Sequence, residues 1–150
     1  MSISTGFIDF GTFICYSFNN EEQKVMFTFL VDLTLRFPED VNFDEIERIL
    51  GMKATSKKTK QESKSKNKFA RISFYTSRKR STNPSQVLED FLLKIHENIK
   101  KVPEILKKYN GRAFLCLIMN FSEYVPTVFL SQTVIDILSE CKIEFDLDFM

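Results

Sequence analysis

The residues that could do chemistry in this chain are few and widely spaced. His96 is the only histidine, and Cys15, Cys116 and Cys141 lie far apart among apolar neighbours. A cysteine nucleophile needs a nearby base and a stabilised thiolate, and apolar surroundings disfavour the thiolate. A structural zinc site needs several Cys or His ligands at close spacing. We therefore expect neither thiol catalysis nor a metal site, and we interpret His96 as a surface or boundary residue at the margin of a helix's apolar stripe.

The chain also lacks the glycine pattern of nucleotide-binding loops. Such loops need several positions where only glycine lets the backbone approach a phosphate group. The chain has four glycines, Gly6, Gly11, Gly51 and Gly111. Their spacing matches neither the P-loop nor the dinucleotide-binding fingerprint. We expect no cofactor and no enzymatic activity.

One row of carboxylates is a candidate for chemistry. Glu144, Asp146 and Asp148 alternate with apolar residues in IEFDLDF, so a strand here places all three side chains on one face. Such a row could form a glycosidase-like pair of carboxylates or a site for a hard cation. Alternation produces the same row on any solvated strand, so a merely solvated surface is the competing interpretation.

Charge divides the chain into two parts. Residues 53–80 contain eleven Lys or Arg and one acidic residue, a net charge of +10, so the remainder carries −9 to give +1 overall. A basic segment that includes Phe74 and Tyr75 could bind phosphate backbones through counterion release and aromatic stacking. A lysine-rich loop that is only solvated is the alternative. The candidate nucleic-acid-binding residues are Lys57, Lys58, Lys60, Lys64, Lys66, Arg78, Lys79 and Arg80.

The acidic remainder favours a different partner. An acidic surface attracts a basic protein and can block its binding site through complementary potentials. The candidate partner-binding residues are Glu123, Asp136, Glu140, Glu144, Asp146 and Asp148.

Alternating apolar residues predict the strands that position these groups. Residues 24–37 favour a long half-buried strand, residues 69–76 a second strand and residues 143–149 an outer strand. The nearly continuous apolar run at 112–121 is typical of a central strand covered on both faces. Residues 7–18 also favour an extended conformation and could form an N-terminal hairpin.

Capping residues mark the ends of the predicted helices. Asn42 begins a short helix that ends at Gly51, and Asn83 begins the longest helix. Pro103 lacks an amide donor and should divide that helix into two pieces. Ser131 caps the last helix.

Together these elements predict a single α+β domain over residues 1–150. Strands alternate with helices, which resembles a ferredoxin-like sandwich with a mainly antiparallel sheet, helices on one face and an N-terminal extended arm or hairpin. Residues 53–68 contain no apolar residue larger than Ala, so we expect a mobile basic loop. The basic SRKRSTNP at 77–84 favours a turn.

Two segments carry a family resemblance. FDEIERILGMKAT and LSQTVIDILSECKIEFDLDF resemble the bacterial family called domain of unknown function 4279 (DUF4279), in which a helix ends in an ILGI-like motif and a terminal helix leads into an LDIDIY-like strand. These features fall on Leu50, Gly51, Met52 and residues 145–149, within a similar region of about 24–149. The chain departs from the pattern at Phe149, where Tyr is common, and in having no Trp in its middle strand. The resemblance implies a fold, and no catalytic residues can be carried over from it.

The sequence leads to a functional hypothesis with two alternatives. We expect a non-enzymatic bacterial protein-binding module, such as an immunity protein that occludes the active site of a cognate toxin, as a monomer or homodimer. The alternatives are a nucleic-acid-binding accessory protein and a small-molecule enzyme that uses the terminal carboxylates. No Lys or Arg precedes the first apolar stretch, and no apolar run approaches the roughly 20 residues that span a membrane, so we expect a cytoplasmic protein with no membrane contact.

Overall fold

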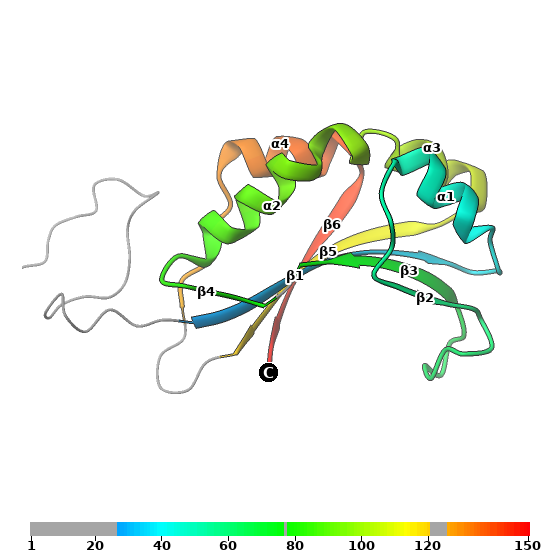
Figure 1. Ribbon diagram of the computed structural model, residues 1–150, viewed down its shortest axis with the longest axis horizontal. Helices are drawn as coiled ribbons and strands as arrows, with labels where there is room; N and C mark the ends of the chain where they lie inside the picture. The colour runs from blue at the N-terminus through cyan, green and yellow to red at the C-terminus, as the bar shows by residue number, and fades with distance from the viewer. Residues whose placement is uncertain (1–26, 77, 121–125) are drawn as a thin grey trace, which may run out of the picture.

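A long central strand organises the fold. The computed structural model describes residues 27–76, 78–120 and 126–150, and within these ranges four helices lie on one side of a six-stranded sheet (Figure 1). The N-terminal hairpin expected at 7–18 lies outside the described residues. The elements in chain order are β1 (Phe27–Phe37), α1 (Phe43–Leu50), β2 (Ser56–Lys58), β3 (Ala70–Tyr75), β4 (Lys79–Ser81), α2 (Pro84–Ile99), α3 (Val102–Tyr109), β5 (Arg112–Asn120), α4 (Gln132–Glu140) and β6 (Ile143–Phe149).

The sheet has the order β2-β3-β1-β5-β6, and the short β4 pairs with the beginning of β1. Every pairing is antiparallel except that of β5 with β6, which are joined through α4. The expected α+β sandwich, with a mainly antiparallel sheet and its helices on one face, is confirmed. The central place of β1 and the single parallel pair are details of strand order that hydrophobic periodicity does not specify.

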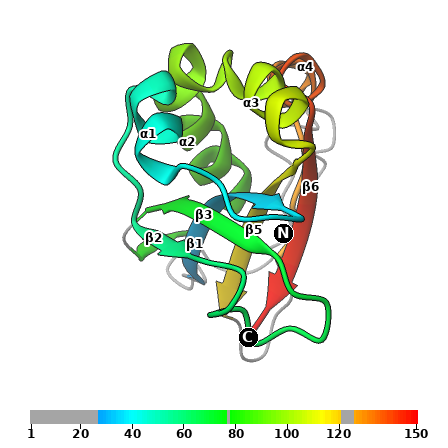
Figure 2. The ribbon, with the colours of Figure 1, turned by 90° about the vertical axis from the view of Figure 1, so that its right-hand side faces the viewer.

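Alternation along the strands separates the two faces of the sheet. Phe29, Val31 and Leu33 of β1 are fully buried, and helices lie over this face. Figure 2 shows all four helices on the same side of the sheet. The intervening residues Leu30 and Asp32 are half-buried and belong to the opposite face, which we call the open face because no described element covers it.

The expected helix ends are confirmed by their capping contacts. Asn42 accepts a hydrogen bond from the Glu45 amide at 3.1 Å, and Gly51 ends α1 in the left-handed region at φ 69°. Asn83 and Ser131 cap α2 and α4 in the same way. The break expected near Pro103 is also present, because α2 ends at Ile99 and α3 begins at Val102.

Three expectations about local structure were wrong. The segment at 53–68 is not loop throughout, since Ser56–Lys58 forms edge strand β2 against β3. The predicted turn at 77–84 contains strand β4, Lys79–Ser81. The apolar strand β5 is fully buried on one face only, because its alternate side chains, among them Phe114, lie half-buried on the open face.

Candidate functional site on the open sheet face

Cross-strand register arranges the open face into rows of different chemistry. One row joins the basic residues Lys58, Arg71, Arg36 and Arg112 across β2, β3, β1 and β5. The next row joins Ser56, Ser73, Thr34, Phe114 and Glu144. The third joins Tyr75, Asp32, Cys116 and Asp146. The open face therefore changes from cationic to hydroxyl-bearing to acidic over successive rows.

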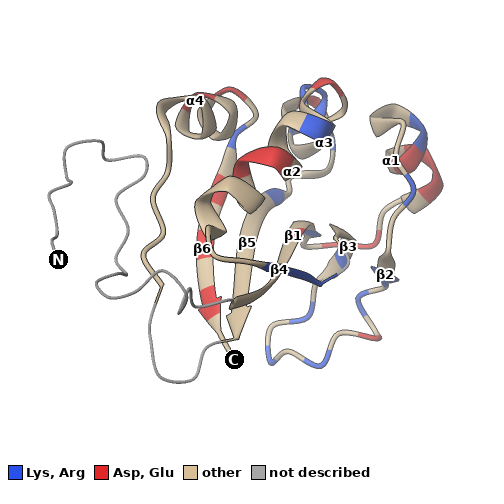
Figure 3. Ribbon diagram, turned by 60° about the vertical axis from the view of Figure 1, so that its left-hand side comes forward, with Lys and Arg blue, Asp and Glu red and all other residues tan. Residues whose placement is uncertain are grey.

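The predicted carboxylates of β6 do share one strand face. We call Glu144, Asp146 and Asp148 the acidic edge, since β6 is the last strand of the described sheet and all three residues are exposed. Figure 3 shows them as acidic bands along β6. Arg112 donates from Nε and Nη2 to the two carboxylate oxygens of Glu144, at 2.9 and 2.7 Å, and this contact raises the pKa of Arg112. Asp146 accepts a hydrogen bond from the Leu147 amide at 2.9 Å.

The other predicted acidic residues lie elsewhere. Asp136 and Glu140 belong to α4, which packs beside β6 on the helix side of the sheet, and both are exposed. Gln132 donates to Asp136 at 2.8 Å, and Glu140 lies 3.2 Å from Nε2 of His96. His96 lies within α2 and is half-buried, as expected for a residue at the margin of the helix's apolar stripe. Glu123 lies outside the described residues.

The predicted basic residues do not form one surface. Lys57 turns toward the helices and donates to Glu47 at 2.7 Å, which raises the pKa of the lysine, whereas Lys58 belongs to the open face. Lys60 forms an ion pair with Glu39 at 3.1 Å. The remaining five are exposed, at two separate places in the chain: Lys64 and Lys66, and Arg78, Lys79 and Arg80.

A buried hydrogen-bond chain runs through the centre of the open face. The Thr34 hydroxyl donates to Asp32 at 3.1 Å and lies 2.8 Å from the Ser73 hydroxyl, and both Thr34 and Ser73 are buried. Burial raises the pKa of Asp32, and the hydrogen bond from Thr34 and the charges of Arg71 and Arg36 partly offset this rise. Local sequence patterns do not indicate this hydrogen-bond network, because Thr34 and Ser73 are 39 residues apart.

Cys116 lies between two carboxylates in the third row. Its cross-strand neighbours are Asp32 on β1 and Asp146 on β6. Burial, followed by the charges of Asp146, Asp148 and Asp32, raises the pKa of the Cys116 thiol to about 11. Burial likewise raises the pKa of Cys141 to about 11. Both thiols are therefore protonated near neutral pH, in agreement with the expectation that their surroundings disfavour a thiolate.

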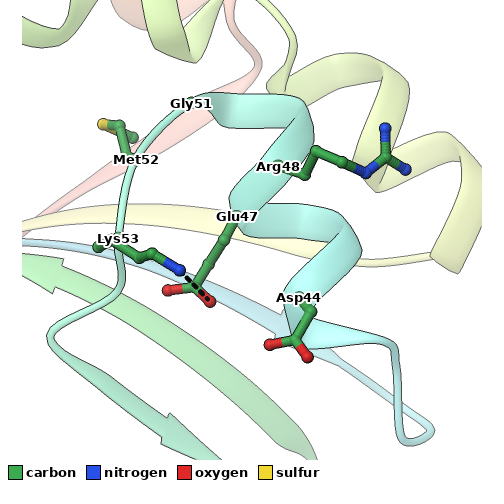
Figure 4. Close-up of a pocket in the computed structure, with 6 residues that line it drawn as sticks. All are labelled: Asp44, Glu47, Arg48, Gly51, Met52 and Lys53. Carbon is green, nitrogen blue, oxygen red and sulfur yellow. Dashed lines mark ion pairs between the residues drawn. The ribbon is translucent and has the colours of Figure 1, made fainter.

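A second site lies away from the open face, at α1. A cavity of about 310 Å³ is lined by Asp44, Glu47, Arg48, Gly51, Met52 and Lys53 (Figure 4). The Glu47 side chain is only 5% exposed, and it accepts hydrogen bonds from the Ala54 amide and from Lys57, each at 2.7 Å. These contacts, with Lys57 first, lower the pKa of Glu47. The Glu47 carboxylate thus links α1 to β2 through hydrogen bonds. Because its oxygens are already bonded within the protein and its pKa is lowered, it is poorly suited to act as a general base.

A second carboxylate of α1 links that helix to α3. Glu45 accepts hydrogen bonds from Lys108 at 2.8 Å and from the Tyr109 hydroxyl. The bond from Lys108 lowers the pKa of Glu45, whereas the bond to Glu45 raises the pKa of Tyr109. Glu45 and Glu47 therefore have structural roles that the sequence analysis missed.

Within the described ranges, neither a metal site nor a membrane-spanning helix is present. No group of three or more His, Cys, Asp or Glu side chains there is arranged to hold a metal ion. Among the helices described, none combines the length and apolar character needed to cross a membrane.

The comparison with protein families agrees with the resemblance of the two sequence segments. The family model described as domain of unknown function (DUF4279) matches residues 21–150, so the chain belongs to this family. No curated protein and no solved structure matches the chain.

Proposed function

We propose that this DUF4279 protein is a non-enzymatic protein-binding module that docks a basic partner at its acidic edge. The observation that carries the proposal is the alignment of Glu144, Asp146 and Asp148, all exposed, along the last strand of the described sheet. Carboxylates aligned in this way raise the local negative potential, which steers a positively charged protein and fixes its orientation.

The neighbouring helix extends this negative surface. Asp136 and Glu140 of α4 are exposed, and α4 packs beside β6. Figure 3 places the acidic bands of β6 and α4 together, apart from the basic residues of β2, β3 and β4. A basic partner therefore meets complementary charge on the β6 side of the molecule and repulsion on the β2 side.

The backbone of β6 offers a second kind of contact. The Met150 amide donates to the Met119 carbonyl of β5, whereas the Leu147 amide donates to the Asp146 side chain. Because successive amides of a strand point to opposite sides, the Leu147 amide points to the outer edge of the sheet. A partner strand could replace the Asp146 contact and add to the sheet, and a second copy of the chain could do so as a homodimer.

The kind of partner that fits best is a protein whose own binding site is basic. A secreted nuclease toxin has such a site because it must hold a polyanion. The finer proposal is that the chain is an immunity protein, which neutralises a cognate toxin by covering that site with its acidic edge.

Co-purification with a candidate partner tests the proposal. The tagged chain is co-expressed with the product of the adjacent gene, and the mass of any complex is measured by light scattering. We expect a one-to-one complex whose dissociation constant rises steeply with salt. Asp146→Asn combined with Asp148→Asn should weaken it at least about tenfold, because complementary charges set both the association rate and the orientation.

A matched double variant controls for net charge. Asp90→Asn with Glu104→Gln removes the same two charges from exposed positions on α2 and α3. This control should bind as the wild type does. Equal weakening by both double variants, or no complex at all, would contradict docking at the acidic edge.

The alternative proposal is nucleic-acid binding, and one observation favours it. Arg78, Lys79 and Arg80 are consecutive exposed cations, two of them in β4 beside the beginning of β1. Fluorescence anisotropy with a labelled single-stranded oligonucleotide tests it. Salt-dependent binding that is lost when these three residues are changed to Gln, without any protein complex, would favour this alternative over the first.

A further inference from the structure

Four positive side chains lie in one line across the open face. Lys58 is directly opposite Arg71, Arg71 is opposite Arg36, and Arg36 is opposite Arg112. We call these four residues the cationic row. Like charges directly opposite each other on a sheet repel, so a row of this kind is unfavourable unless negative charge lies close to it.

Among the described residues, a carboxylate is bonded directly to this row at one end only. Glu144 accepts both hydrogen bonds of the Arg112 fork, whereas no ion pair joins Lys58, Arg71 or Arg36 to any carboxylate in the described ranges. Asp32 is the acidic residue of β1, and its charge interacts with Arg71 and Arg36 without an ion pair or hydrogen bond to either. Three adjacent cations therefore remain without a directly bonded counter-charge.

The guanidinium groups are positioned by contacts other than carboxylates. Arg36 lies over two aromatic rings, 5.0 Å from the Phe69 centroid and 4.6 Å from the Phe114 centroid. Stacking of this kind fixes the plane of the guanidinium and leaves its N–H edge free to donate. The Nε group of Arg71 is buried and has no hydrogen-bond acceptor among the described residues. Buried donors without acceptors are rare in proteins, so Arg71 marks where an acceptor belongs.

From this arrangement we infer that the cationic row is a binding site for a compact oxyanion, a phosphate or carboxylate group, held by Arg71 and Arg36 with Lys58 at its margin. The planar fork of arginine matches the oxygens of both groups, and the lysine adds a point charge. This site is distinct from the acidic edge and goes beyond the proposed function.

The next rows limit where the anion can lie. Thr34 and Ser73 are buried and bonded to each other, and Thr34 also donates to Asp32, so these hydroxyls are largely satisfied within the protein. The negative charges of Asp32 and Asp146 in the third row repel an anion. The oxyanion is therefore confined to the cationic row, and an extended polyanion along the open face is disfavoured.

Titration with small anions tests the inference. Inorganic phosphate and citrate are titrated separately at constant ionic strength, and the Nε–H signals of the arginines are followed by NMR. We expect a saturable shift of the Arg71 signal with at least one of them, and the two arms decide between a phosphate and a carboxylate ligand. Absence of a saturable shift with both probes would overturn the inference.

Variants that each remove one charge distinguish anion binding at the cationic row from nonspecific attraction to the net charge of the protein. Arg71→Gln and Arg36→Gln should each raise the dissociation constant about tenfold, and Arg36→Lys should lose much of the binding because lysine cannot form the fork. Lys58→Gln offers a milder change at the edge strand if an arginine variant does not fold. The matched control is Arg78→Gln, an exposed cation outside the row, which should bind as the wild type does.

Two other outcomes would count against the inference. An equal loss of affinity in Arg78→Gln and Arg71→Gln would mean that only net charge matters. Binding of a single-stranded oligonucleotide without binding of either small anion, lost on changing Arg78, Lys79 and Arg80, would assign anion recognition to the basic segment at β4. Neither outcome depends on whether a protein partner binds the acidic edge.

Discussion

The two faces of the sheet come from the same alternating strands but differ in what decides their properties. On the covered face, Leu33 of β1 pairs with Leu115 of β5, and both are fully buried. On the open face, the same pairing places Arg36 beside Arg112. Burial of apolar surface is non-directional, so the covered face depends mainly on being apolar. Charged residues act on their immediate neighbours, so the chemistry of the open face depends on register.

The largest expected effect comes from breaking the covered face. Leu33→Ala should lower the free energy of unfolding by about 3 kcal/mol, because it leaves a cavity in a packed core. Leu30 is a half-buried residue of the same strand on the open face, and Leu30→Ala should cost only about 1 kcal/mol, since water can fill the space. Urea denaturation of both variants measures the difference. Equal losses would mean that the open face is covered as fully as the other.

The next largest loss of stability is expected on removing Glu47, the α1 carboxylate that bonds to the basic segment. Glu47→Ala should cost about 2 kcal/mol, because it removes the acceptor for the Ala54 amide and for Lys57. The control is Asp44→Ala, whose side chain is 93% exposed and 3.5 Å from the same lysine, and it should change stability by less than about 0.5 kcal/mol. Urea denaturation at pH 7 compares the two variants.

The pH dependence of the Glu47 variant follows from the lowered pKa of that carboxyl. A group with a lowered folded-state pKa stabilises the protein above its unfolded pKa, and this contribution is lost as the pH falls through the folded value. The difference between wild type and Glu47→Ala should therefore shrink as the pH falls below the ordinary value of 4.5. A difference that stays constant down to pH 2 would contradict an ionic role for Glu47.

A smaller loss of stability is expected at Gly111, directly before β5, where the chain packs closely against the end of β1. A Cβ atom added at Gly111 would lie 2.5 Å from Cδ1 of Phe37 and 2.8 Å from the Arg36 carbonyl oxygen. Gly111→Ala should therefore cost about 1 to 2 kcal/mol through overpacking. The neighbouring Asn110→Gly is the control, because Asn110 has φ 55° and glycine adopts that conformation without strain. Thermal unfolding should show a lower melting temperature for Gly111→Ala only.

Much of the fold could be predicted from local patterns. Alternation identified β1 and β6, and capping residues located the helix ends, because these signals act over a few neighbouring residues. Strands β2 and β4 were missed, since each has only three residues and a basic composition that otherwise favours loop. Their strand conformation comes from pairing with β3 and β1, which no local pattern reports.

The candidate site was less accessible to sequence reasoning. The acidic edge was found because Glu144, Asp146 and Asp148 lie within one strand. The cationic row was missed because Arg36 and Arg71 are brought together by the register of β1 with β3, and an arginine in an alternating strand otherwise indicates only a solvated face. The predicted nucleic-acid-binding residues show the opposite problem, because neighbours in the sequence are separated in the fold. Lys57 and Lys58 are adjacent in sequence but belong to different faces of the sheet.

The smallest expected effect tests the balance of charges within the open face. Burial raises the pKa of Asp32 above its ordinary value of 3.8. The folded state then holds the proton more tightly than the unfolded state. The ionisation of Asp32 therefore makes the protein less stable as the pH rises from the unfolded-state pKa to the folded-state pKa. Asn cannot ionise but can still accept the hydrogen bond from Thr34. The stability of Asp32→Asn relative to wild type should therefore increase as the pH rises above the ordinary value of 3.8.

The same variant also probes the cationic row. Removing the negative charge of Asp32 lowers the repulsion of an anion held by Arg36 and Arg71, so phosphate or citrate should bind Asp32→Asn at least as tightly as wild type. A relative stability that falls as the pH rises would show that the attraction of Asp32 to Arg36 and Arg71 exceeds the cost of its burial. In that case Asp32 would itself be the counter-charge of the row, and the anion affinity of the variant would decide how much of the row's charge is left for a ligand.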